Sequence, residues 1–146
     1  MKTEHIEVVD YDSKWVDDFN QIKGEIEEAL KDLVLAVEHV GSTSVPLLAA
    51  KPIIDLDVVI DQNDLKEVIF LLENHGYIYE GDLGLKDREA FRYEEKEHLR
   101  THHLYVCSQD SKELKRHLAF RNYLRKHPNI VKEYGKIKFC YNLSNS

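Results

Sequence analysis

The sequence predicts an α+β domain in which helices cover the faces of a mixed sheet. Segments with apolar residues at helical spacing alternate along the chain with short extended segments rich in Val, Ile and Tyr. The chain has 146 residues, of which 42% are hydrophobic and 32% charged, so it can bury one core without disulfide bonds. No repeat, low-complexity tract or linker divides it, and residues 1–146 are therefore expected to form a single domain.

The first forty residues are expected to form a strand, a helix and a second strand. Residues 5–9 alternate apolar and polar side chains, as a strand does. Asp12 is expected to cap a helix that ends near Leu30 or Asp32. The apolar stripe of this helix comprises Trp15, Phe19, Ile22, Ile26 and Leu30. Residues 33–40 return to extended chain and lead to Gly41.

The remaining elements follow from apolar spacing and from helix-breaking residues. A short helix is expected over residues 43–50, ended by Pro52, and a strand over residues 53–60. A second helix is expected between a cap near Asp64 and Gly76. Three further strands are predicted over residues 77–79, 91–94 and 102–107. The last third, residues 111–138, is predicted to be helical with an interruption at residues 127–128.

The strand at residues 53–60 carries two carboxylates within an apolar run. Asp55 and Asp57 share one face because side chains alternate along a strand, and Asp is uncommon in strands. Such a contradiction of local propensity often marks a functional site, and two carboxylates on one face suit a hard divalent cation. The alternative interpretation is an edge strand that uses inward-facing charges against aggregation.

A turn of small residues, Gly41-Ser42-Thr43-Ser44, precedes this strand by about a dozen residues. Glycine permits backbone conformations closed to other residues, and hydroxyls and free N–H groups at a helix start favour a phosphate. The alternative is an ordinary capped helix start. Together, the turn and the carboxylates predict a phosphate site beside a cation site, as metal-assisted chemistry on nucleotides requires.

Composition narrows the classes of partner. The formal charge of −7 argues against binding to duplex nucleic acid but not against a small phosphorylated ligand in a local pocket. Apolar runs are too short for a transmembrane helix, and the N-terminus lacks the apolar core of a signal peptide. Two scattered cysteines form no disulfide framework. A cytoplasmic protein without membrane association is expected.

Several spaced motifs resemble the GrpB family (the UPF0157 type), a group within the nucleotidyltransferase superfamily with a polymerase-β-like fold. The strongest is residues 38–57, EHVGSTSVPLLAAKPIIDLD. Tyr11 with Trp15, the HHLYV stretch at 102–106, the FRNYLR stretch at 120–125, and Tyr134 with Lys138 resemble it as well. Leu47 stands where relatives usually have Gly. The resemblance implies a polymerase-β-like nucleotidyltransferase fold, and a C-terminus shorter than that of relatives, which continue through another helical segment.

The resemblance also implies roles for individual residues. Gly41 and Ser42 fall where the superfamily holds nucleotide phosphates, and Asp55 and Asp57 where it binds Mg²⁺. The cofactor expected is therefore Mg²⁺ or Mn²⁺. Active members add a third carboxylate from a neighbouring strand, yet the strand at 102–107 offers only His, Leu and Tyr. His103 is expected to face the carboxylates as a metal ligand or general base, or merely to be hydrogen-bonded there.

Basic residues supply candidates for phosphate contacts. Thr43, Lys51 and Arg121 are predicted to help bind phosphate, and Arg121 and Arg125 project from one helix face because they lie four residues apart. Arg92 and Arg100 are weaker candidates. For any single arginine, the alternative is an exposed, salt-bridged helix face.

Three classes of function follow from these patterns. The first is a metal-dependent nucleotidyltransferase in which Asp55, Asp57 and His103 are catalytic and a nucleotide or other phosphorylated small molecule is the ligand. The second is a non-catalytic nucleotide- or coenzyme-A-related binding module, because family domains also occur joined to dephospho-coenzyme A kinase. The third is a purely structural partner-binding domain.

Overall fold

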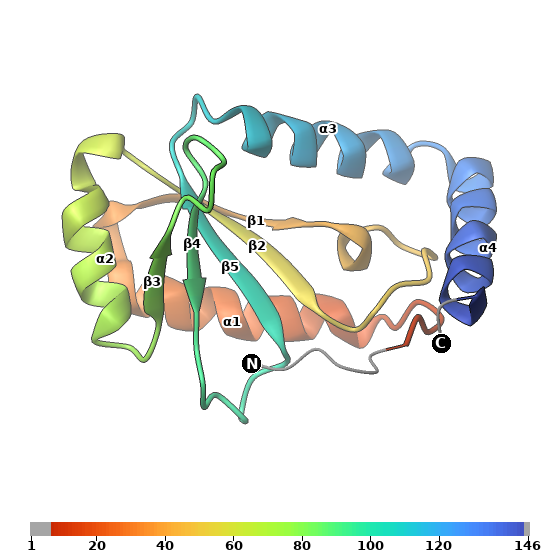
Figure 1. Ribbon diagram of the computed structural model, residues 1–146, viewed down its shortest axis with the longest axis horizontal. Coiled ribbons are helices and arrows are strands. Elements are labelled where there is room, and N and C mark those ends of the chain that lie inside the picture. The colour runs from red at the N-terminus through yellow and green to blue at the C-terminus, as the bar shows by residue number, and fades with distance from the viewer. Residues whose placement is uncertain (1–6, 145–146) are drawn as a thin grey trace.

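Five strands form one mixed sheet in the order β1–β2–β5–β4–β3 (Figure 1). The strands are β1 (Val34–Val40), β2 (Ile54–Ile60), β3 (Ile78–Gly81), β4 (Glu89–Arg92) and β5 (His102–Cys107). β2 and β5 run parallel, whereas the other neighbours are antiparallel. The computed structural model describes residues 7–144, and the side chains of residues 7–138.

Helices cover both faces of this sheet, which confirms the predicted α+β class. α1 (Lys14–Leu30) crosses behind the strands, and α2 (Leu65–Glu73) packs on the same side (Figure 1). α3 (Lys112–Arg125) and α4 (Pro128–Ser144) follow one another around the side of the sheet formed by β1 and β2. Within residues 7–144, no helix combines the length and the apolar character that a membrane span needs.

The main core lies between the sheet and α1, and it dictates which side chains face the other way. Ile54, Leu56, Val58 and Ile60 of β2 are at most 2% exposed and pack with the apolar stripe of α1. Burial of each such side chain contributes roughly 1.5–3 kcal/mol. Because side chains alternate, this burial directs the odd-numbered residues of β2 to the opposite face of the sheet. That opposite face, here called the open face, carries the polar residues discussed below.

α3 and α4 cover part of the open face with two smaller apolar clusters. Leu114 and Leu118 of α3 pack against Val59 and Cys107. Val131 of α4 packs with residues at the end of α3 and in the segment after β1, namely Leu124, Val45 and Leu48. These clusters fix the two helices at one side of the carboxylates and leave the rest of the open face accessible.

Most predicted elements agree with the structure, and the differences have local causes. The expected helix at residues 43–50 is only a single 3₁₀ turn, η2 (Ser42–Ser44). The chain does not continue as a helix because Val45 is extended, with φ −109° and ψ 115°, and Leu47 then has φ +69°, the left-handed conformation that glycine adopts readily.

The N-terminal strand and the first helix cap also need correction. Residues 5 and 6 of the predicted strand lie outside the described residues, and Val9 forms only an isolated bridge with Ala50. Ser13, not Asp12, occupies the N-cap position of α1. Asp12 nevertheless accepts a hydrogen bond from the backbone N–H of Lys14 at 2.9 Å, so its carboxylate still satisfies a free donor of the first turn.

Candidate functional site

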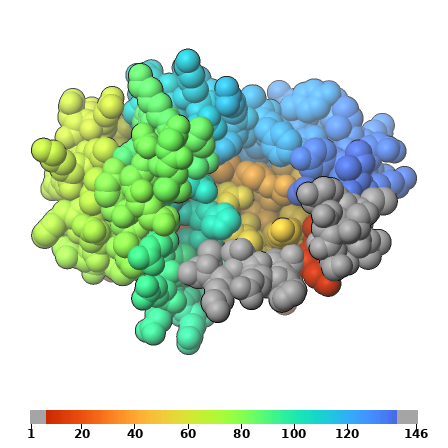
Figure 2. Space-filling model, in the orientation of Figure 1, coloured from red at the N-terminus to blue at the C-terminus, as the bar shows by residue number. Residues whose placement is uncertain are grey.

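The two carboxylates of β2 lie at the centre of the open face. Asp55 pairs with His103 and Asp57 with Tyr105 across the parallel β2–β5 ladder, so all four side chains share one face. The prediction that His103 faces the carboxylates is therefore confirmed, and Tyr105 shares that face. We call the recess above these four residues the cleft. Figure 2 shows atoms of β2 and β5, yellow and cyan, at the bottom of a hollow between the green strands and the blue helices.

Asp55 lies tightly between His103 and the backbone of Gly41. Its Oδ1 is 2.9 Å from Nδ1 of His103, which donates the hydrogen bond because an ionised carboxylate only accepts. A Cβ added to Gly41 would stand 2.4 Å from Oδ2 of Asp55. Gly41 also has φ +73° and ψ −173°, a region populated almost only by glycine. Gly41 is thus required both by its own conformation and by the approach of Asp55.

Asp57 is buried and has one oxygen without a partner. It is 1% exposed, and its Oδ2 accepts a hydrogen bond from Nδ1 of His117 on α3 at 2.6 Å. This bond raises the pKa of His117, against the opposing effect of burial. Oδ1 of Asp57 is buried without a hydrogen-bond partner. A buried carboxylate oxygen in this condition fits a cation that completes its surroundings.

The turn that precedes β2 is held by its own hydroxyls. Ser44 donates a hydrogen bond to the carbonyl of Gly41 at 2.5 Å, and Thr43 bonds Nε2 of the buried His39 at 2.9 Å. Both hydroxyl residues are buried, so these contacts stabilise the turn. Ser42 is less buried, and its hydroxyl contacts the ammonium group of Lys138 on α4. Of the three hydroxyl residues in the turn, Ser42 is the one whose hydroxyl contacts a positively charged side chain.

Basic side chains from α3 and α4 approach the turn and the carboxylates. Arg125 donates to the carbonyl of Ser44 at 3.0 Å. Arg121 donates to Glu38 at 2.9 Å and to the carbonyl of His39 at 3.1 Å, with its side chain only 13% exposed. These two arginines and His117 stand four residues apart along one face of α3.

Two lysines complete the basic surroundings. Burial lowers the pKa of Lys138 to about 8, although the charge of Asp55 acts in the opposite direction. Lys51, predicted to meet a phosphate, is exposed at the start of the segment that leads to β2. The other basic candidates, Arg92 and Arg100, form ion pairs away from the carboxylates, with Glu94 and Asp18 respectively.

The donor set around the carboxylates suits a cation that shares its coordination with a ligand. Within residues 7–138, no group of three His, Cys, Asp or Glu side chains is gathered closely enough to hold a metal alone. Mg²⁺, however, is commonly bound by one or two carboxylates together with water and substrate phosphates. Asp55 and Asp57, with the unpartnered Oδ1 of Asp57, fit that description.

No carboxylate on β5 supplements the pair, as the sequence predicted. Glu38 of β1 pairs with Asp57 across the antiparallel ladder and therefore shares the open face. Its carboxylate forms the ion pair with Arg121, so it is already neutralised. Sequence reasoning overlooked Glu38 because strand order was needed to place β1 next to β2.

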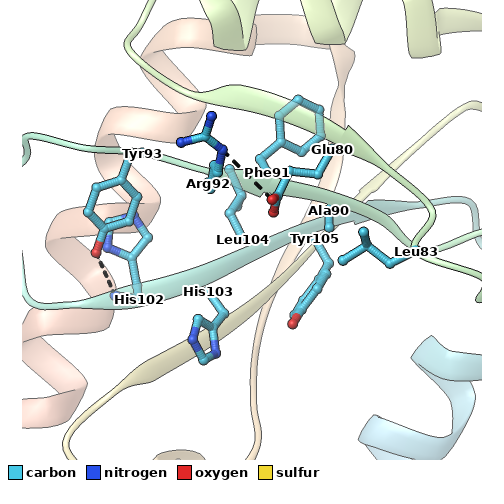
Figure 3. A pocket seen from close by; sticks show the side chains of 10 residues that line it. All are labelled: Glu80, Leu83, Ala90, Phe91, Arg92, Tyr93, His102, His103, Leu104 and Tyr105. Atoms are coloured by element: carbon cyan, nitrogen blue, oxygen red, sulfur yellow. Dashed lines mark hydrogen bonds and ion pairs between the residues drawn. The ribbon is translucent and has the colours of Figure 1, made fainter. Parts of the chain in front are cut away.

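A pocket of about 240 Å³ extends from the cleft across β4 and β3. His103 and Tyr105 project to the same side of β5 at one end of it, with Leu83 beside Tyr105 (Figure 3). Glu80 and Arg92, whose charged groups lie 3.8 Å apart, form another part of its lining. His103 lines this pocket, and Nε2 is the ring nitrogen not used in its bond to Asp55.

The sequence matches a known family along most of its length. The profile of the family described as GrpB protein matches residues 5–142. The UPF0157 protein YqkA of Bacillus subtilis is 37% identical over 136 residues, and the UPF0157 protein BH1888 of Halalkalibacterium halodurans is 36% identical over 135 residues. Each match covers 91% of this chain, but it covers 38% of YqkA and 67% of BH1888. The chain thus spans little more than a third of the first relative.

Solved structures resemble the fold. The crystal structure of the conserved protein GrpB from Enterococcus faecalis has a TM-score of 0.77 at 41% identity, covering 88% of this chain and 78% of that one. Cid1 with the UTP analogue UMPNPP has a TM-score of 0.57 at 10% identity, covering 84% of this chain and 37% of that one. A mutant of the Cid1 poly(U) polymerase bound to MgATP has a TM-score of 0.57 at 11% identity, covering 84% of this chain and 39% of that one. The expected polymerase-β-like fold is confirmed.

Proposed function

The chain belongs to the GrpB family, and we propose that it is a metal-dependent nucleotidyltransferase whose cleft binds a nucleotide or other phosphorylated ligand. The observation that carries the proposal is the buried Oδ1 of Asp57, which has no hydrogen-bond partner. An ionised group that is buried and only partly satisfied costs free energy, and a divalent cation would remove that cost. The nucleotides and MgATP bound by Cid1, which shares the fold, are in keeping with this ligand class.

The residues around the turn suit the phosphate end of such a ligand. Ser42 and Lys138 offer a hydroxyl and an ammonium group, and Lys51 adds an exposed positive charge. Thr43 and Arg121 act indirectly, because their side chains hold the turn and β1 in place. When bound at Asp55 and Asp57, Mg²⁺ or Mn²⁺ would supply charge neutralisation at the phosphate oxygens.

His103 is suited to act as the general base. Because Nδ1 donates to Asp55, Nε2 of the neutral imidazole carries a lone pair, and His103 lines the pocket across β4 and β3. In the proposed reaction an acceptor hydroxyl gives its proton to Nε2 while its oxygen forms a bond to the α-phosphorus. The bond between that phosphorus and the bridging oxygen breaks, and pyrophosphate leaves. Asp55 would fix the tautomer and orientation of the imidazole, a role separate from cation binding.

A second candidate is a non-catalytic nucleotide- or coenzyme-A-related binding module, the type of role implied by a functional link to dephospho-coenzyme A kinase. The observation in its favour is that β5 contributes no carboxylate and that each carboxylate of β2 is hydrogen-bonded to a histidine. Both candidates require ligand binding in the cleft. They differ in whether an acceptor is modified.

Calorimetric titration of nucleotides and coenzyme A, with Mg²⁺, with Mn²⁺ or with chelator, tests the binding step. We expect metal-dependent binding that Asp55→Asn abolishes and that Asp32→Asn, an exposed carboxylate beyond the end of α1, leaves unchanged. Ser42→Ala should weaken triphosphate binding by about 1 kcal/mol, the value of one hydrogen bond. Binding that is equal in Asp55→Asn would refute the metal site.

Pyrophosphate release in the presence of small hydroxylated acceptors separates the two candidates. Release that is lost in His103→Gln, with nucleotide affinity retained, supports the transferase. Binding without release, under every acceptor tested, supports the binding module.

A further inference from the structure

Two buried side-chain polar atoms within residues 7–138 lack a hydrogen-bond partner, and both belong to the cleft. One is Oδ1 of Asp57 and the other is Nε of Arg88. Most buried donors in native proteins are satisfied, so an unsatisfied guanidinium N–H calls for a physical reason. The first atom suits a cation, and the second requires an acceptor.

Arg88 lies on the open face at the edge of the cleft. Ala90 pairs with Tyr105 across the β4–β5 ladder, and Arg88 precedes Ala90 by two residues and so faces the same side. The guanidinium carbon of Arg88 is 4.3 Å from the centre of the Tyr105 ring, a stacked cation–π arrangement. Since Tyr105 pairs with Asp57, Arg88 stands at the Asp57 end of the cleft.

The loop before β4 holds Arg88 in this position. Leu83 and Asp87 have φ values of +52° and +57°, which are uncommon for residues other than glycine. Asp87 is fixed because its carboxylate accepts hydrogen bonds from the backbone N–H and the hydroxyl of Ser108. The stacked ring and this anchored neighbour leave the guanidinium few alternative positions, so a ligand would meet a pre-oriented donor.

Arg92, the last residue of β4 and four positions after Arg88, is a natural comparison. Its guanidinium pairs with Glu94 at 3.2 Å and lies 3.8 Å from Glu80, and 46% of its side chain is exposed. Arg92 is therefore satisfied by the protein itself. Arg88, directly before β4, carries the same charge but keeps a buried N–H without an acceptor.

We propose that Arg88 is a phosphate-binding residue and that the cleft takes a polyphosphate chain extending from the turn at Gly41 and Ser42 to Arg88. The proposal rests on the proposed function and specifies its ligand. Gly41 adjoins Asp55 on the β1 side of β2, whereas Arg88 stacks on Tyr105 of β5, the neighbour of Asp57. The two ends are therefore offset by about 7 Å along β2, the distance between alternate residues, and they also lie on opposite sides of the β2–β5 pair. A single phosphate cannot reach both ends, whereas a triphosphate can.

The chemistry of the two ends suits a phosphate ligand. A guanidinium edge matches the oxygens of phosphate and can donate two parallel hydrogen bonds. A divalent cation at the carboxylates would be shared by the same polyphosphate. Arg88 would then offset charge on the phosphate farthest from the turn.

Affinities for tripolyphosphate and for orthophosphate, each measured calorimetrically with Mn²⁺, test this inference. Arg88→Gln should weaken tripolyphosphate binding about tenfold, the scale of one charge-assisted hydrogen bond, and change orthophosphate binding less than about twofold. Arg92→Gln should leave both within about twofold. The same ranking should hold for a nucleoside triphosphate against its monophosphate.

The outcomes separate this inference from the proposed function. Equal tripolyphosphate affinities for Arg88→Gln and Arg92→Gln would overturn the role of Arg88 and leave the metal-dependent site standing. Absence of binding of every phosphate probe to the unsubstituted protein would overturn both. If Arg88→Gln does not fold, Arg88→Lys replaces it. That variant should lose at least about threefold for tripolyphosphate because a lysine lacks the planar fork, and an unchanged affinity would likewise refute the proposal.

Discussion

Replacing Gly41 by alanine is the sharpest perturbation of the cleft. The substitution adds one methyl group at a position with φ +73° and ψ −173°, where glycine is almost the only residue found. The added Cβ would stand 2.4 Å from Oδ2 of Asp55, a distance that real Cβ atoms essentially never show. The backbone, the carboxylate or both must therefore move.

The expected loss of stability has two parts. Holding a side-chain-bearing residue in this region of φ and ψ costs roughly 1–3 kcal/mol. Rotation of Asp55 away from the new methyl group would also break its 2.9 Å bond to His103, worth roughly 1 kcal/mol because both partners are partly exposed. We therefore expect Gly41→Ala to lower the free energy of unfolding by about 2–4 kcal/mol and to abolish metal-dependent nucleotide binding.

Urea denaturation followed by circular dichroism measures this loss, and Gly24→Ala is the matched control. Gly24 lies in α1 with no atom within 4 Å of an added Cβ. The same substitution there should increase stability by about 0.5–1 kcal/mol, because alanine favours the helix. A loss at Gly41 of less than about 1 kcal/mol, together with retained nucleotide binding, would refute the close approach of Asp55 to the turn.

Two further predictions concern pH. The raised pKa of His117 should fall in Asp57→Asn, as measured by NMR titration in the presence of chelator, and an unchanged value would disprove the ion pair. Because this pKa is higher in the folded than in the unfolded protein, the pair stabilises the fold fully below about pH 6.5 and its contribution is lost as pH rises through the raised value. Lys138 behaves in the opposite sense, since burial lowers its pKa to about 8 from 10.5. Between about pH 8 and 10.5 the unfolded chain holds a proton that the native state has released, so the free energy of unfolding should rise with pH over this range. Urea denaturation of Lys138→Met should show no such rise. A rise of equal size in both proteins would contradict the lowered pKa of Lys138.

Much of the fold could be predicted because apolar spacing and burial agree. The helix from Lys14 to Leu30 has an unbroken apolar stripe, and the alternation of apolar and acidic residues at the start of β2 places both carboxylates on one face. The prediction was wrong at residues 43–50, where a short helix ended by Pro52 was expected. The turn ends at an extended Val45, and Leu47 follows in the left-handed conformation, which the side chain of a leucine does not favour.

The site was predictable where it is local in sequence and not where it depends on tertiary structure. The sequence alone points to Asp55 and Asp57, because aspartate is uncommon in strands, and to Gly41, because glycine permits backbone conformations closed to other residues. His117 was overlooked, although its spacing of four residues from Arg121 placed it on the same helix face. Arg88 carried no signal, because its importance comes from an unpartnered N–H and from the ring of Tyr105, and both require coordinates.

The central claim is that a divalent cation binds at Asp55 and Asp57 together with a phosphorylated ligand. Paramagnetic broadening of histidine ring signals by Mn²⁺, in the presence of a nucleoside triphosphate, tests it most directly. His103 and His117 touch the two carboxylates, whereas His98 pairs with Glu25 of α1, behind the sheet. We predict that substoichiometric Mn²⁺ broadens His103 and His117 selectively and spares His98. Equal broadening of the three histidines, or none, would contradict the claim.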